Sequence, residues 1–185
     1  MAHNVCPWWL GYLLASPVRR LAHNPRKILA PYIRPGMTVM DLGPGMATFT
    51  LDLARFAGPT GKVIAVDIQA RMLEQVKKRA AKAGLLDRIE TLLAGDDGAW
   101  ARGLAGRVDF ALAFYMVHEV SDATAFFTLV KATLAPGGRL FVVEPKMHVS
   151  ARAYAGTVGA AQKAGFRIVD SPKIRQSRTM LLSPA

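Results

Sequence analysis

The stretch from Thr38 to Thr48 reads TVMDLGPGMAT, and it decides the fold. Its first five residues form a short apolar run, which is typical of a buried parallel strand. A turn with two glycines, Gly43 and Gly45, follows at once. Glycines allow the backbone to turn tightly and allow a ligand to approach the main chain closely. The strand and its turn therefore predict a ligand loop, although such a turn alone is weak evidence.

The spacing of the glycines disfavours a pyrophosphate-binding loop. A Gly-x-Gly-x-x-Gly pattern that starts at Gly43 would need its last glycine at Thr48. The sequence instead fits Asp-x-Gly-x-Gly-x-Gly, with Asp41 at the first position and Ala47 in place of the last glycine. A nicotinamide-dependent dehydrogenase is therefore the least favoured hypothesis.

Strands and helices are expected to alternate along the chain. Short apolar runs predict seven strands, over residues 38–42, 62–68, 89–93, 108–114, 139–143, 166–172 and 178–182. Apolar residues at helical spacing predict helices over 48–56, over 71–83, and after the capping residues Asp122 and Ser150. A Pro-Gly-Gly turn at 136–138 should end a helix and start the fifth strand. The pattern predicts an α/β fold, in which a seven-stranded, mostly parallel sheet has helices on both faces and closes with a C-terminal antiparallel hairpin.

Length and composition favour one domain over residues 1–185, with 37–185 as its core and 1–36 as an N-terminal helical lid or cap. The single cysteine, Cys6, excludes a disulfide within the chain and a Cys-x-x-Cys pair, and no metal site is expected. The apolar stretch 5–15 is too short to cross a bilayer and lacks a secretory cleavage site. We therefore expect a cytoplasmic protein without a transmembrane segment.

The net charge of +11 lies at the two ends of the chain. Residues 1–36 hold five basic and no acidic side chains, and residues 146–185 hold seven basic side chains and one acid, Asp170. Residues 37–145 hold twelve of each sign. The basic ends favour an anionic acceptor or an acidic surface, to which Lys146, His148, Arg175 and Arg178 would contribute.

The chain resembles the class I S-adenosylmethionine-dependent methyltransferases, and especially the small-molecule branch that includes the ubiquinone and menaquinone C-methyltransferases. Five short motifs in the family's order carry the resemblance, at residues 39–45, 66–68 with 72–73, 95–97, 108–110 with 117–119, and 134–140. The resemblance covers about residues 25–183. It implies a Rossmann-like doubly wound sheet, S-adenosylmethionine as cofactor, and S-adenosylhomocysteine as product.

The same resemblance implies a cofactor site at the carboxyl ends of the strands. The backbone of Gly43 and Gly45 would pass under the methionine part, and Asp67 would accept hydrogen bonds from the ribose hydroxyls. Ile68 would lie against the adenine, and Asp96, rather than Asp97, would accept a hydrogen bond from the adenine amino group. The expected cofactor residues are Asp41, Gly43, Gly45, Ala47, Asp67, Ile68, Asp96 and Phe114.

A base near the end of the fourth strand would help an acceptor to lose its proton. His118 is the leading candidate because its unperturbed pKa lies near neutrality, and Tyr115 and Glu119 lie beside it in the sequence. Glu144, at the end of the fifth strand, is a second candidate. The alternative is that His118 only holds its loop.

Three functional hypotheses remain open. The first is methyl transfer by in-line displacement to a small, flat or anionic acceptor. In this hypothesis an N-terminal cluster could form a lid, a membrane-surface helix or part of the core. The cluster consists of Cys6, Trp8, Trp9, Tyr12 and Leu13. The second is an RNA methyltransferase, which the charge favours and which the sequence Phe114–Val117 disfavours because an Asn-Pro-Pro-Tyr type of motif is missing there. The third is a binding module for the cofactor without catalysis. The sequence favours no particular oligomeric state.

Overall fold

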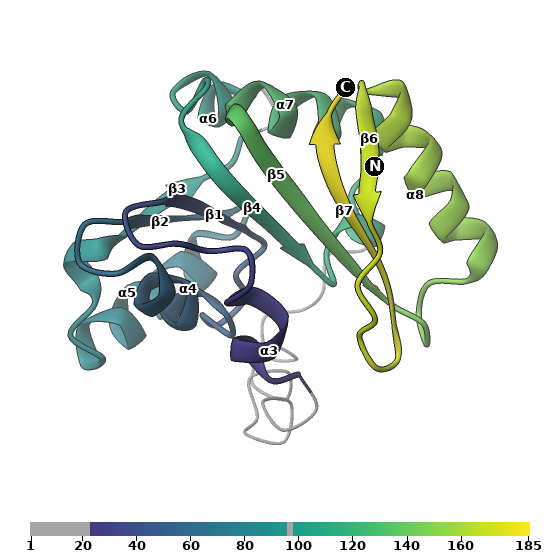
Figure 1. Cartoon of the computed structure of the whole chain (residues 1–185). Helices are drawn as coiled ribbons and strands as arrows, with labels where there is room; N and C mark the ends of the chain where they lie inside the picture. Colours follow the sequence, from purple (N-terminus) through teal and green to yellow (C-terminus); the bar gives the residue numbers. More distant parts are fainter. Residues whose placement is uncertain (1–22, 96–97) are drawn as a thin grey trace. The chain divides into compact units, whose positions relative to one another are not determined.

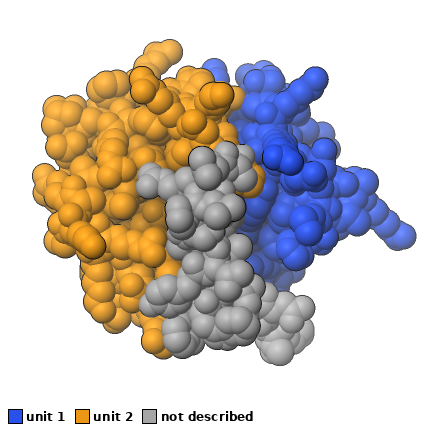
Figure 2. All heavy atoms as spheres, turned by 90° about the horizontal axis from the view of Figure 1, so that it is seen from below, with its two compact units in different colours: residues 1–5, 101–185 blue, residues 6–100 orange. Residues whose placement is uncertain are grey.

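The first strand, β1 (Thr38–Leu42), has its last four residues buried, as its apolar sequence predicts. It belongs to a computed structural model that describes residues 23–95 and 98–185 (Figure 1). The described residues fall into two compact units, with residues 23–100 in unit 2 and residues 101–185 in unit 1 (Figure 2). The predicted lid cluster around Cys6, and Asp96, lie outside the described residues.

Unit 2 contains three parallel strands, which are β1, β2 (Lys62–Asp67) and β3 (Ile89–Leu93). Its helices are α3 (Pro25–Leu29), α4 (Thr50–Ala57), α5 (Ala70–Lys82), the short η1 (Leu86–Arg88) and the start of α6 (Ala99–Arg102). Both α4 and α5 pack against strands. In α5 the buried residues are Met72, Leu73, Val76 and Ala80, so the predicted apolar stripe forms the buried face of the helix.

Unit 1 contains the other four strands. β4 (Val108–Phe114) and β5 (Leu134–Pro145) are parallel, whereas β7 (Ser177–Pro184) runs antiparallel to β5 and to β6 (Phe166–Asp170). The helices are η2 (Val117–Glu119), α7 (Ala123–Thr133) and α8 (Ala151–Lys163). Both predicted caps are confirmed, because Asp122 accepts from the Ala125 N–H at 2.9 Å and Ser150 accepts from the Ala153 N–H at 3.1 Å.

The strands form a seven-stranded sheet in the order β3-β2-β1-β4-β5-β7-β6. This confirms the predicted α/β fold with a mostly parallel sheet and an antiparallel C-terminal hairpin. The single domain with an N-terminal lid stays a prediction. Among the described residues, every helix is too short or too polar to cross a membrane.

The prediction for the start of the fifth strand was wrong. α7 ends at Thr133 and β5 begins at Leu134, so the Pro-Gly-Gly sequence lies within the strand rather than before it. Leu134 pairs with Val108, and the register shifts before Arg139 pairs with Phe110. A Cβ on Gly138 would lie 2.7 Å from the Val108 carbonyl oxygen, so this irregularity needs a residue without a side chain.

Candidate active site

The loop after β1 has a left-handed backbone at three alternating positions. The φ angles are +65° at Gly43, +54° at Gly45 and +59° at Ala47. Gly43 N–H donates to the Val66 carbonyl at 2.9 Å, which ties the loop to the end of β2. Among the residues that the structure describes, a Cβ on Gly45 would meet nothing within 4 Å, so these residues leave the main chain open to a ligand there. At Ala47, where the resemblance predicts glycine, the methyl group makes this conformation strained.

Asp41 is buried and is held by a neighbour across the loop. Thr50 Oγ1, at the start of α4, donates to Asp41 Oδ2 at 2.7 Å. Burial raises the pKa of the Asp41 carboxyl to about 7; the Thr50 hydrogen bond opposes the rise, and the charge of Asp67 adds to it. The pair links the two ends of the glycine loop. Sequence reasoning missed Thr50, although a hydroxyl residue soon after the loop was visible in the sequence.

The predicted ribose ligand, Asp67, ends β2 and is partly buried. Its Oδ1 accepts a hydrogen bond from the Gln69 N–H at 2.9 Å, which orients the carboxylate at the strand end. A carboxylate fixed in this way fits a sugar diol, because it can accept hydrogen bonds from both hydroxyls.

Two large apolar side chains next to Asp67 are exposed. Ile68 is 58% exposed and Leu93, which ends β3, is 54% exposed. Leu93 pairs with Asp67 in the sheet, and the Ala94 N–H donates to the Asp67 carbonyl at 2.9 Å. Exposed apolar groups beside a carboxylate fit a flat ring joined to a sugar, so unit 2 fits the adenosine that the resemblance implies. Leu93 was missed, although its place at the end of an apolar strand was visible in the sequence.

The turn after β4 positions Tyr115 in unit 1. Its φ is +60°, and its N–H donates to the Val143 carbonyl at 2.8 Å. Tyr115 Oη lies 2.7 Å from Ser177 Oγ, and Ser177 donates its own hydroxyl hydrogen to the Arg175 carbonyl, so Tyr115 is the donor of the pair. The ring of Phe114, which is buried, lies 4.5 Å from that of Tyr115. Ser177 was missed by sequence reasoning.

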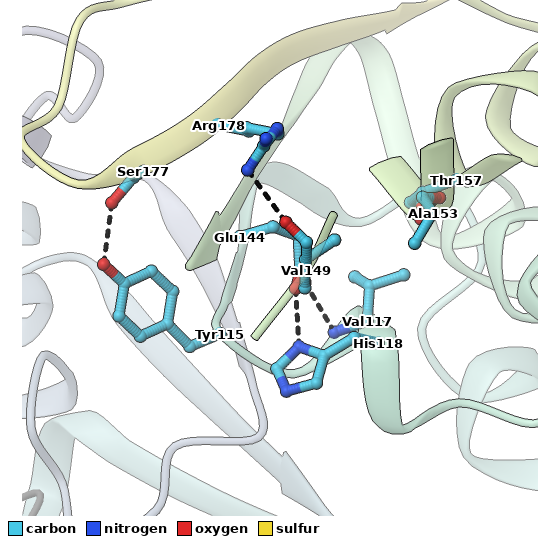
Figure 3. Close-up of polar contacts among 9 residues, drawn as sticks. All are labelled: Tyr115, Val117, His118, Glu144, Val149, Ala153, Thr157, Ser177 and Arg178. Carbon is cyan, nitrogen blue, oxygen red and sulfur yellow. Dashed lines mark hydrogen bonds and ion pairs between the residues drawn. The ribbon is translucent and has the colours of Figure 1, made fainter. Parts of the chain in front are cut away.

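The two candidate bases, His118 and Glu144, form one dyad (Figure 3). His118 Nδ1 is 2.5 Å from Glu144 Oε2, and Glu144 Oε1 accepts from the Val117 N–H at 2.9 Å. The Glu144 side chain is 0% exposed, and that of His118 is 28% exposed. A carboxylate can only accept hydrogen bonds, so Nδ1 carries the hydrogen and Nε2 is left as a base.

The surroundings of the dyad raise the pKa of His118. The hydrogen bond to Glu144 is the main cause, burial opposes it, and the charges of Glu144 and Glu119 add to the rise. Glu144 also lies near Tyr154, whose pKa rises to about 12 through burial and this charge, with Arg178 acting against the rise. Arg178 itself donates to the Val149 carbonyl at 2.8 Å. The structure thus brings His118, Glu119 and Glu144 together in unit 1.

In the described part of the chain, no group of three or more His, Cys, Asp or Glu residues could hold a metal ion. Unit 2 therefore has features that fit an adenosine, and unit 1 separately has an acid–base dyad. The first set suits a nucleoside-bearing ligand, and the second suits removal of a proton.

Comparison with known proteins identifies the family of the chain. Residues 33–178 match the model of a methyltransferase domain family. A ubiquinone/menaquinone biosynthesis C-methyltransferase, UbiE from Hahella chejuensis, is 29% identical over 125 residues, which are 66% of this chain and 49% of that protein. An uncharacterised 37.1 kDa protein in transposon TN4556 of Streptomyces fradiae is 33% identical over 117 residues, or 60% of this chain and 31% of that protein. The chain thus spans less than half the length of these curated relatives.

Solved structures show the same fold. A SAM-dependent methyltransferase from Aquifex aeolicus has a TM-score of 0.82 at 22% identity, with 96% of this chain and 97% of that chain covered. TrmN from Thermus thermophilus has a TM-score of 0.69 at 24% identity, with 97% and 52% covered. Since the family model matches most of its length, the chain belongs to the methyltransferase domain family, and it has the fold of S-adenosylmethionine-dependent methyltransferases.

Proposed function

We propose that the chain transfers a methyl group from S-adenosylmethionine to a small, anionic acceptor by in-line displacement, with the His118–Glu144 dyad as general base. The dyad is the observation that carries this proposal, because a buried carboxylate that orients an imidazole is an arrangement for proton transfer. The cofactor, when bound, supplies a methyl group on a positively charged sulfur.

Unit 2 supplies the residues that would hold the cofactor. The backbone of the 43–47 loop would contact its methionine part, Asp67 its ribose, and Ile68 with Leu93 the adenine face. Asp41 would keep the loop in place through Thr50. The predicted contacts of Asp96 with the adenine amino group and of Phe114 at the end of β4 remain part of this proposal.

In unit 1, His118 would take the proton from the acceptor atom that attacks the methyl group. Nε2 would receive this proton, and Nδ1 would keep its hydrogen and go on donating it to Glu144. Glu144 then stabilises the resulting imidazolium by its charge. Tyr115, which Ser177 holds by its hydroxyl, would contact the acceptor beside the base.

Two loops in unit 1 support an anionic acceptor. Residues 146–150 follow β5 and residues 171–176 join β6 to β7; we call these the basic loops. The Lys146 N–H donates to the Gln176 carbonyl at 2.9 Å, which joins them. Their exposed basic side chains are Lys146, His148, Lys173 and Arg175. Pro145 pairs with Ser177, so both loops adjoin the strand ends that carry Glu144 and Ser177.

A labelling experiment tests the proposal. Purified protein is incubated with S-adenosylmethionine that carries a labelled methyl group, together with either a small-molecule cell extract or total RNA. We expect label in anionic small molecules, and about a hundredfold less of it with His118→Gln. Glu90→Gln, which changes an exposed residue of β3, is the control and should give wild-type levels. Label that enters only RNA would show the RNA methyltransferase instead. No label in either pool, with tight binding of S-adenosylhomocysteine, would show a binding module without catalysis.

A further inference from the structure

One residue of the glycine loop, Ala47, has a backbone conformation that is unusual for a residue with a side chain. Of its three left-handed positions, Gly43 and Gly45 accept the conformation without cost, whereas Ala47 has a Cβ and a φ of +59°. A residue with a Cβ is strained in such a conformation. Ala47 is also buried, so its methyl group is enclosed by neighbours. The conformation therefore needs a contact that keeps it in place.

A charged side chain supplies that contact. Arg79 Nη1 donates to the Met46 carbonyl oxygen at 2.7 Å, across 33 residues of sequence. This carbonyl belongs to the peptide unit that leads into Ala47, so its direction determines the backbone angles on both sides of that peptide. A hydrogen bond from a guanidinium is stronger than one between neutral groups. Arg79 thus acts on the strained peptide itself.

Arg79 is anchored by the helix that follows Asp67. It lies in the last turn of α5, next to Ala80, which is fully buried. α5 starts shortly after Asp67 and packs against β2 and β3. The Arg79 hydrogen bond therefore connects the glycine loop to the helix that follows Asp67, the proposed ribose ligand, and Ile68.

We propose that Arg79 is a positioning residue for the cofactor loop, which holds the Met46–Ala47 peptide in the left-handed geometry that a glycine would adopt unaided. This inference rests on the proposed role of the loop in binding the cofactor. It predicts that the need for Arg79 depends on the residue at position 47. With glycine there, loss of the Arg79 hydrogen bond costs little.

A double-mutant cycle tests this coupling, with calorimetry of S-adenosylhomocysteine binding as the readout. We expect Arg79→Met, which keeps the apolar stem, to weaken binding about tenfold in the wild-type background. In the Ala47→Gly background we expect the same change to weaken binding by no more than about twofold. Lys78→Met, which removes a neighbouring exposed charge, is the matched control and should bind as the wild type.

Two results would overturn the inference. One is wild-type affinity in Arg79→Met, and the other is an equal loss in both backgrounds, which would show that Arg79 acts independently of Ala47. Urea unfolding of each variant shows whether a loss of affinity comes from loss of the folded protein. Asp67→Ala separates the two proposals: if it weakens binding while Arg79→Met does not, only the positioning role fails, and if Asp67→Ala has no effect, the cofactor site itself is wrong.

Discussion

The turns after β1 and β4 share a left-handed backbone conformation but differ in the groups that they present. Each has a residue other than glycine in the left-handed region, with φ of +59° at Ala47 and +60° at Tyr115. In the first turn Gly43 and Gly45 leave the main chain without a Cβ, whereas in the second the large polar side chains of Tyr115 and His118 follow the strand. One turn thus suits binding through its backbone, and the other suits chemistry through its side chains.

The two turns are also held differently. Arg79 donates to a main-chain carbonyl in the first turn, and Ser177 accepts the hydroxyl hydrogen of Tyr115 in the second. We therefore expect changes in the first turn to alter affinity for the cofactor and changes in the second turn to alter turnover.

Replacement of Glu144 should have the largest effect. Glu144→Gln removes the charge that raises the pKa of His118, so we expect a rate about a hundredfold lower and a rising limb of the pH–rate profile that moves to lower pH. The sign follows because His118 acts as a base only above its pKa, and that pKa falls without the carboxylate. The profile is measured by methyl incorporation into the small-molecule pool. A lower rate with an unmoved limb would show that Glu144 acts on the fold rather than on His118.

Replacement of Asp67 should act on affinity. We expect Asp67→Ala to weaken binding of S-adenosylhomocysteine at least about tenfold, or about 1.4 kcal/mol, through loss of a charged hydrogen-bond partner. Asp67→Asn keeps an acceptor for the Gln69 N–H and separates loss of charge from loss of the turn. Asp87→Ala, an exposed acid in η1, is the matched control. Unchanged affinity in Asp67→Ala would mean that the ribose binds elsewhere.

Replacement of Asp41 should change how stability depends on pH. The pKa of Asp41 is about 7 in the folded state, above its value in the unfolded chain, so the folded state binds more protons and stability falls as pH rises through this range. The expected slope is roughly 1.4 kcal/mol per pH unit between about pH 4 and 7. Asp41→Asn should lose this slope in urea unfolding measured at several pH values. Parallel curves for the two proteins would contradict the raised pKa.

The smallest effect is expected at the Tyr115–Ser177 hydrogen bond. Tyr115→Phe and Ser177→Ala should each lower the free energy of unfolding by about 1 kcal/mol. The double variant should lose little more than either single one, because both remove the same bond. Fully additive losses in denaturant unfolding would show that the two hydroxyls act separately.

Much of the fold could be predicted because short apolar runs define the parallel strands. The strands 38–42, 89–93 and 108–114 have the predicted bounds. The start of β5 could not be predicted, because it depends on the pairing of Leu134 with Val108 and on the close approach at Gly138. Such contacts between distant parts of the chain leave no local pattern in the sequence.

The sequence could name candidate site residues but not the contacts between them. His118 and Glu144 were separate candidates, and their hydrogen bond depends on the β4–β5 register, which pairs Phe114 with Val143. Arg79 and Ser177 were missed because each acts through a partner far away in the sequence. Thr50 was missed although its partner Asp41 is only nine residues away. The assigned roles of the individual residues stay predictions until the variants are measured.

The hydrogen bond between Lys146 and Gln176 has a practical consequence for engineering. It makes the segments after β5 and before β7 a mechanically joined pair, so a substitution that shifts one backbone also shifts the other. A directed-evolution library for new acceptors should therefore randomise both segments at once, since winners selected from one segment alone will carry the geometry imposed by its unchanged neighbour.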